Sequence, residues 1–164
     1  MEKAVVAEIL TIGTELLLGH SLDTNSADIG EQLAEAGIDV YWKTTVGDNE
    51  ERIAKALRLA LARSEIVICT GGLGPTEDDV TCRVIARVAG RPLILDQVVL
   101  ESIRRRFAER GLTMSSNNER QALIPDGAIV LSNPRGTAPG LFIRLGDGKV
   151  VVAGSMSTGT QGSG

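Results

Sequence analysis

Short apolar runs alternate with segments of helical periodicity along the first half of the chain. The runs Val5–Ile12, Val40–Val46 and Ile66–Cys69 predict strands that are covered on both faces. Three sets of apolar residues at helical spacing predict the helices between and after these strands. They are Ala27, Ile29, Leu33 and Ala36; Ile53, Leu57 and Leu61; and Val80, Val84, Ile85 and Val88. This alternation predicts right-handed crossover units and a mostly parallel sheet.

Glycine and polar residues between these runs predict where loops lie and where helices end. The polar, glycine-containing stretch Thr14–Ser26 is predicted to be a loop, and Gly37 and Gly90 are predicted to follow helix ends. In the second half, Val99, Ile103 and Phe107 predict one more helix, ended by Gly111, and residues 112–127 a loop or short helical segment. Strand-like runs follow at residues 128–131, 141–145 and 150–153, and Gly146-Asp147-Gly148 between the last two is typical of a hairpin turn.

Composition narrows the function classes. The 164 residues suffice for one domain with a real core, and with 43% hydrophobic but only 2% aromatic residues that core must be aliphatic. Few aromatic rings and a net charge of -4 argue against nucleic acid as the main partner. No long apolar segment or signal peptide is present, so we expect a cytoplasmic chain without a membrane partner. The two cysteines, Cys69 and Cys82, are expected to be buried, reduced thiols.

The stretch Thr70–Thr81, with glycines at 71, 72 and 74, links a predicted strand to a predicted helix. A glycine-rich turn at this place exposes backbone N–H groups at the positive end of a helix dipole, which favours phosphate binding. Asp78 and Asp79 follow at once, and carboxylates tolerate a phosphate only with a cation between them, so a metal-bridged diphosphate is indicated. The alternative is a tight turn that needs positive φ angles. The spacing is neither that of a Walker loop nor that of a dinucleotide fingerprint.

Three acids are expected near this turn. Ligands of open parallel sheets bind at the carboxyl ends of the strands, where the segments Thr11–Ser26, Val46–Asn49 and Thr70–Asp79 converge. Each acid also has a plainer interpretation: Asp48 as a helix N-cap, Asp79 as the partner of Thr76 in a capping box, and Glu15 as a solvated loop residue. Their convergence on one edge favours function.

Two further segments carry candidate chemistry. Gly136-Thr137-Ala138-Pro139-Gly140 lies between strand-like runs, either as a simple turn or as a second backbone surface that approaches the ligand. The cluster Arg104-Arg105-Arg106 is interpreted as a solvated helix face.

Several long motifs in a fixed order resemble one family. They are Gly13-Thr14-Glu15-Leu16-Leu17-Leu18-Gly19, Asp23-Thr24-Asn25-Ser26, Val46-Gly47-Asp48-Asn49, the stretch Thr70–Thr81, Asn117, Gln121, Ala122, Pro125 and the segment 136–140. Together they resemble the amino-terminal domain of the competence/damage-inducible CinA proteins, in the molybdopterin-binding (MoaB/Mog-like) superfamily. The resemblance covers roughly residues 4 to 153.

This resemblance implies a three-layer α/β/α fold and an anionic pterin or nucleotide site at the glycine turn. It implies metal-dependent hydrolysis of an ADP-ribose-like dinucleotide, with Mg²⁺ as the expected metal and Asp48 and Asp79 as catalytic residues. The expected metal ligands are Asp48, Asp78, Asp79 and Glu15. The residues expected to bind the ligand are Thr70, Gly71, Gly72, Gly74, Thr76, Thr81, Asn25, Gly136, Thr137, Pro139 and Gly140.

Alternatives stay open within and beyond this resemblance. Relatives of the same superfamily adenylylate molybdopterin, which is then the bound ligand, and a third option is a non-catalytic nucleotide-binding and oligomerisation module. A homo-oligomer, dimer or trimer, is expected in each case.

The end of the sequence departs from the family pattern. Val152-Ala153-Gly154-Ser155-Met156 stands where the resemblance leads us to expect a Leu-Pro-Gly-Val-Pro-like segment, and the carboxy-terminal amidase domain of many CinA proteins is not among these 164 residues. We expect residues 1–153 to form the domain and residues 154–164 to be a flexible tail or expression remnant.

Overall fold

The computed structural model describes residues 5–19, 24–71, 75–131 and 140–154. Its main element is a six-stranded sheet in the order β2-β1-β3-β8-β7-β6. The strands in that order are Asp39–Val46, Val6–Ile12, Ile66–Gly71, Val150–Ala153, Gly140–Arg144 and Ile129–Leu131. The first four run parallel, whereas β7 and β6 are antiparallel to their neighbours. The predicted mostly parallel sheet and the final hairpin are confirmed.

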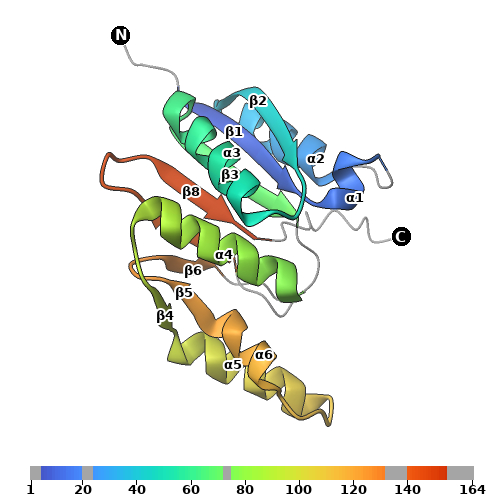
Figure 1. Ribbon diagram of the computed structural model, residues 1–164. Helices are drawn as coiled ribbons and strands as arrows, with labels where there is room; N and C mark the ends of the chain where they lie inside the picture. The colour runs from blue at the N-terminus through green and yellow to red at the C-terminus, as the bar shows by residue number, and fades with distance from the viewer. Residues whose placement is uncertain (1–4, 20–23, 72–74, 132–139, 155–164) are drawn as a thin grey trace.

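Helices cover both faces of this sheet, which gives the expected three-layer α/β fold (Figure 1). They are α2 (Thr24–Glu35) on one face and α3 (Glu50–Arg63) and α4 (Pro75–Ala89) on the other. Side chains alternate along β1: Leu10 and Ile12 pack in the cluster with α3 and α4, whereas Ile9 packs with Ile29 of α2. This alternation explains why the buried strands are apolar throughout.

A smaller unit extends from α4, away from α2 and α3 (Figure 1). It comprises β4 (Leu93–Leu95), α5 (Gln97–Glu109), α6 (Ser116–Glu119), the 3₁₀ turn η1 (Arg120–Ala122) and β5 (Leu123–Pro125). Strands β4 and β5 form an antiparallel pair, and α5 and η1 share a small apolar cluster around Ile103. Arg91 ties this unit to the main sheet, because its guanidinium donates hydrogen bonds to the carbonyls of Asp126 at 3.2 Å and Arg144 at 2.6 Å.

Two sequence-based expectations were wrong. The stretch Thr14–Ser26 is not all loop, because it holds α1 (Thr14–Leu17) and the start of α2 at Thr24. The strands β4 and β5 were not expected, because three residues are too few to show a period. The expected helix ends are confirmed: Gly37, Gly90 and Gly111 follow α2, α4 and α5 with φ angles of 80°, 68° and 68°.

The core is aliphatic, as expected. The buried hydrophobic residues that the structure describes are Ala, Val, Ile and Leu, with Cys69. Burial raises the pKa of the Cys69 thiol to about 12. Cys82 is only half-buried, which corrects the expectation of two buried thiols, because it borders a hollow between α4 and the smaller unit. No helix in the described part of the chain is long and apolar enough to cross a membrane.

One carboxylate is enclosed between the sheet and α3. Glu8 of β1 is fully buried and accepts hydrogen bonds from Arg63 Nε at 2.7 Å and Arg63 Nη2 at 3.1 Å, and from the Thr44 hydroxyl at 3.2 Å. The hydrogen bond with Glu8 raises the pKa of Arg63, whose guanidinium also lies 3.9 Å from the centre of the Trp42 ring. This pair sits toward the amino end of β1, far from the edge at which the strands end.

Candidate active site at the carboxyl edge of the sheet

The carboxyl ends of β1, β2, β3 and β8 lie at one edge of the sheet, which we call the rim (Figure 1). The Gly13 N–H, just past β1, donates to the carbonyl of Val46 at the end of β2 over 2.9 Å. The Gly154 N–H, just past β8, donates to the carbonyl of Cys69 over 3.3 Å. Helix α4 begins on the same side, so its positive dipole end points toward the rim (Figure 1).

Asp48 belongs to the rim and not to the cap of α3. The N-cap is Asn49, whose side-chain oxygen accepts from the Arg52 N–H at 3.0 Å, so the alternative interpretation of Asp48 as the cap of this helix was wrong. The carboxylate of Asp48 instead accepts from the Thr14 hydroxyl at 3.2 Å. The segments after β1 and β2 therefore meet, as predicted, and Thr14 orients the acid, a role that the sequence did not single out.

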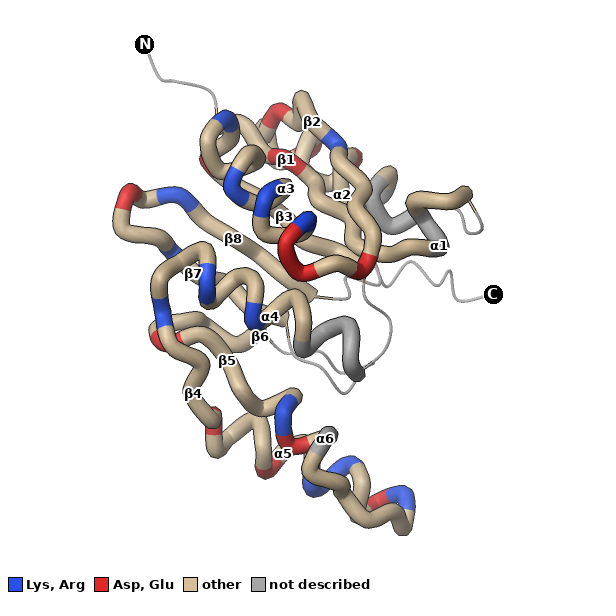
Figure 2. The backbone as a smooth tube through the Cα atoms, in the orientation of Figure 1, with Lys and Arg blue, Asp and Glu red and all other residues tan. Residues whose placement is uncertain are grey.

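Acidic side chains gather on this side of the molecule. Glu50 and Glu51 lie in the first turn of α3, after Asp48 and the N-cap Asn49, and Figure 2 shows acidic positions in red where β2 ends and α3 begins. Arg83 and Arg87 of α4 balance two of them, with nitrogen–oxygen distances of 3.4 Å to Glu50 and 2.6 Å to Glu51. The charge of Asp48 has no such arginine partner among the described residues, which leaves it available to a cation.

Gly71 lets β3 approach β1 closely at the rim. Its φ is 98°, and a Cβ at this position would lie 2.1 Å from the carbonyl oxygen of Ile12. Gly140, the first residue of β7, is packed in a similar way, because a Cβ on Gly154 would lie 3.0 Å from its Cα. Two of the predicted ligand-binding glycines, Gly71 and Gly140, thus lie at the rim with neighbouring backbone packed closely against them.

Thr70 contributes a buried hydroxyl just before the glycine turn. Its side chain is 2% exposed, and its Oγ1 has no hydrogen-bond partner among the residues that the structure describes. A buried polar atom without a partner is costly, so such atoms are common where a ligand or ion completes the site. Thr81 of α4 is buried as well, at 8% exposure.

The start of α4 changes the interpretation of Asp79. The helix begins at Pro75, a residue favoured at the first helical position, so Thr76 lies inside the helix and is not its N-cap. The capping-box alternative for Asp79 therefore loses its basis. Asp78 and Asp79 belong to the first part of α4, at the rim end, but their side chains lie outside the described part of the structure.

Several predicted site residues have only their backbone described, or lie outside the described residues. Glu15 lies in α1, Asn25 in α2 and Thr76 in α4, with backbone described and side chain not. The others lie outside the described residues altogether: Gly72, Gly74, Gly136, Thr137 and Pro139. Among the described side chains there is no group of three metal-ligating residues, and Asp48 is the one expected metal ligand that they include.

The family follows from comparison with known proteins. The sequence profile described as "Probable molybdopterin binding domain" matches residues 8–160. The chain is 36% identical to the protein CinA of Thermoplasma acidophilum, described as of unknown function; the match covers 92% of this chain and 87% of that one, with a TM-score of 0.83. The chain belongs to the CinA-type molybdopterin-binding domain family.

Curated relatives and more distant structures agree with this membership. A CinA-like protein of Nostoc sp. is 50% identical over 136 residues, which are 83% of this chain and 32% of the relative. The chain thus spans about a third of the length of the curated relatives it matches. The tungsten cofactor synthesizing protein MoaB of Pyrococcus furiosus shares the fold, with a TM-score of 0.53 at 19% identity over 93% of this chain and 81% of that chain.

Proposed function

We propose that this CinA-type domain binds an ADP-ribose-like dinucleotide at the rim and hydrolyses its diphosphate with the help of a divalent cation, Mg²⁺. The observation that carries the proposal is the position of Asp48. Its carboxylate accepts a hydrogen bond from Thr14 at the edge where α4 begins. Asp48 does not cap α3, and its carboxylate has no arginine partner among the described residues.

The donor set suits a hard cation. The carboxylate of Asp48 and the hydroxyl of Thr14 are oxygen donors, as Mg²⁺ prefers, and Glu15, Asp78 and Asp79 belong to helices at the same edge. In the proposal, Asp48 and Asp79 hold the metal, with Asp78 or Glu15 completing the set. A bound Mg²⁺ would supply charge neutralisation on the phosphorus oxygens and an activated water.

The chain itself supplies the anion site. Backbone N–H groups of Gly71, Gly72 and Gly74 are proposed to face the diphosphate before α4, whose dipole favours negative charge there. The unpartnered hydroxyl of Thr70 would donate to a phosphate oxygen, and Thr76, Thr81, Asn25 and the segment 136–140 would surround the rest of the ligand. These groups bind and orient the substrate before water attacks.

The test is hydrolysis of ADP-ribose by the purified chain, with AMP and ribose 5-phosphate as products. We expect turnover that requires Mg²⁺ and falls at least about a hundredfold in Asp48→Asn, because the variant keeps the size of the side chain but not its charge. Glu51→Gln is the matched control, since it removes a nearby charge that pairs with Arg87. Equal turnover by Asp48→Asn and the unmodified chain would refute the assignment.

A second candidate is transfer of an adenylyl group to molybdopterin, and the family description supports it only as far as molybdopterin is the ligand. ATP-dependent adenylylation of molybdopterin, without turnover of ADP-ribose, would support it. Binding of either ligand without turnover would support a non-catalytic nucleotide-binding and oligomerisation module, for which a dimer or trimer in solution is expected.

A further inference from the structure

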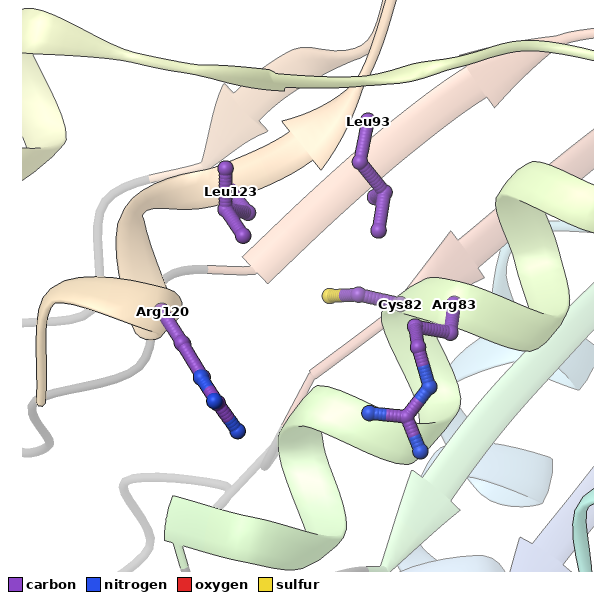
Figure 3. Close-up of a pocket in the computed structure, with 5 residues that line it drawn as sticks. All are labelled: Cys82, Arg83, Leu93, Arg120 and Leu123. Atoms are coloured by element: carbon purple, nitrogen blue, oxygen red, sulfur yellow. The ribbon is translucent and has the colours of Figure 1, made fainter. Parts of the chain in front are cut away.

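A hollow of about 260 Å³ lies between α4 and the smaller unit, and of the residues described at the rim only Arg83 is among its described lining. Its described lining comes from α4, β4, η1 and β5 (Figure 3): Cys82, Arg83, Leu93, Arg120 and Leu123. Sites that enclose a whole drug-sized ligand start at about 300 Å³, so this hollow fits a small molecule or one end of a larger one.

The hollow has an apolar wall and a cationic side. Leu93 and Leu123 lie beside the thiol of Cys82, whereas the guanidinium groups of Arg83 and Arg120 extend toward the same side of the hollow from opposite elements (Figure 3). A ligand that matches this division carries an anionic group at one end and an apolar body at the other.

Both guanidinium groups are available to an anion. That of Arg120 has no ion pair or side-chain hydrogen bond among the described residues, and Arg120 is exposed. Arg83 lies 3.4 Å from Glu50, but both side chains are about half exposed, at 45% and 40%. Exposed pairs of this kind are weak, so a dianion can compete with Glu50 for Arg83.

We propose that this hollow is a binding site for a phosphomonoester whose organic part is apolar or planar. One arginine satisfies a carboxylate, whereas two arginines from opposite walls match the three oxygens and double charge of a phosphate. The organic part would lie against Leu93 and Leu123. The site goes beyond the proposed hydrolysis and does not depend on it, because Cys82 lies about two turns, roughly 10 Å, along α4 from Pro75 at the rim.

Cys82 provides a direct reporter of occupancy. The other cysteine, Cys69, is fully buried, so a neutral reagent such as iodoacetamide should modify Cys82 in the folded protein. The rate of that modification is followed by peptide mass spectrometry with phenyl phosphate as the probe. We expect phenyl phosphate to protect Cys82 at concentrations about tenfold below those of inorganic phosphate, which lacks the apolar body, or of phenol, which lacks the anion.

Variants of the two arginines test whether their charge, and not only the shape of the hollow, binds phenyl phosphate. Arg120→Gln and Arg83→Gln should each raise the protecting concentration of phenyl phosphate about tenfold, and Arg120→Lys should recover part of the loss. Arg87→Gln is the matched control. Arg87 lies one turn from Arg83 along α4, pairs with Glu51 and is not among the described residues that line the hollow, so the variant removes the same charge outside the proposed site. Asp48→Asn should leave protection unchanged, so failure at the rim and failure here are distinguishable.

Three results would overturn the proposal. If phenol protected Cys82 as well as phenyl phosphate does, the hollow would bind only the apolar body of the probe. If benzoate protected Cys82 equally well, the site would have no preference for phosphate over carboxylate. Undiminished protection in a folded Arg120→Gln/Arg83→Gln double variant would show that the guanidinium groups do not bind the probe. Circular dichroism of each variant verifies that it is folded.

Discussion

Thr14 and Asp48 form a reciprocal pair across the rim. The Thr14 hydroxyl donates to the Asp48 carboxylate over 3.2 Å and accepts from the Asp48 N–H over 3.3 Å. Gly47, between β2 and Asp48, lies beside the same side chain, because a Cβ there would be 3.4 Å from the Thr14 hydroxyl oxygen. The position of the acid is therefore set by the segment after β1 and not by the helix that follows it.

The first prediction concerns this pair. Thr14→Val removes the hydroxyl and should raise the Mg²⁺ concentration for half-maximal ADP-ribose hydrolysis about tenfold, since a hydrogen bond to a charged group contributes about 1.5–3 kcal/mol. Thr14→Ser should retain the native value. Thr113→Val, at an exposed site between α5 and α6, is the control. An unchanged Mg²⁺ dependence in Thr14→Val would show that Thr14 does not position a metal ligand.

The second prediction compares two glycines with positive φ. A Cβ added at Gly90 (φ +68°) would meet nothing within 4 Å, whereas a Cβ added at Gly71 (φ +98°) would lie 2.1 Å from the Ile12 oxygen. Gly90→Ala should cost about 1–2 kcal/mol from backbone strain alone. Gly71→Ala should cost clearly more, because β1 and β3 must separate. Urea unfolding of the two variants gives the comparison, and equal costs would show that the close approach is easily relieved.

The fold could be predicted from the sequence where a strand or helix is long enough to show its hydrophobic periodicity. The alternation around Leu10 and the helical spacing of Ile53 and Leu57 decide the strands and helices of the main sheet, because each faces a wide apolar surface. The pair β4–β5 could not be predicted, since Ile94 and Ile124 belong to three-residue strands whose pairing depends on contacts distant in the sequence.

The sequence predicted which segments meet at the rim, but not the contacts between their side chains. Topology alone brings the segments after β1 and β2 together, so the nearness of Asp48 to the end of β1 could be expected. Local preference did not exclude the alternative of Asp48 as a cap, because Asp48 and Asn49 are both good N-caps and only the hydrogen bond to the Arg52 N–H decides between them. The hollow at Arg83 and Arg120 had no sequence signal, because its walls come from separate elements.

The third prediction tests the ion pair between the buried carboxylate of Glu8 and the partly exposed Arg63. Arg63→Met should lower the Tm by about 10 °C, because the carboxylate of Glu8, only 1% exposed, loses its counter-charge. The double variant Glu8→Leu/Arg63→Met should recover most of that loss, since apolar residues of similar volume replace buried ion pairs well. Differential scanning calorimetry of both variants decides the matter. A double variant less stable than Arg63→Met would show that Glu8 has a further role, through Thr44 for example.

The last prediction follows from the thiol of Cys69. Burial raises its pKa from 9.0 to about 12, so between these values the unfolded chain loses a proton that the folded chain keeps. The free energy of unfolding is therefore fully retained below about pH 9 and should fall by up to about 1.4 kcal/mol per pH unit above it. Cys69→Ala should lack this dependence of the free energy of unfolding on pH, although its stability at neutral pH is lower. Cys82→Ala should retain the dependence. Urea unfolding at several pH values from about 8 to 10.5 measures the slopes. Equal slopes for Cys69→Ala and Cys82→Ala would show that the buried thiol does not govern the loss of stability at alkaline pH.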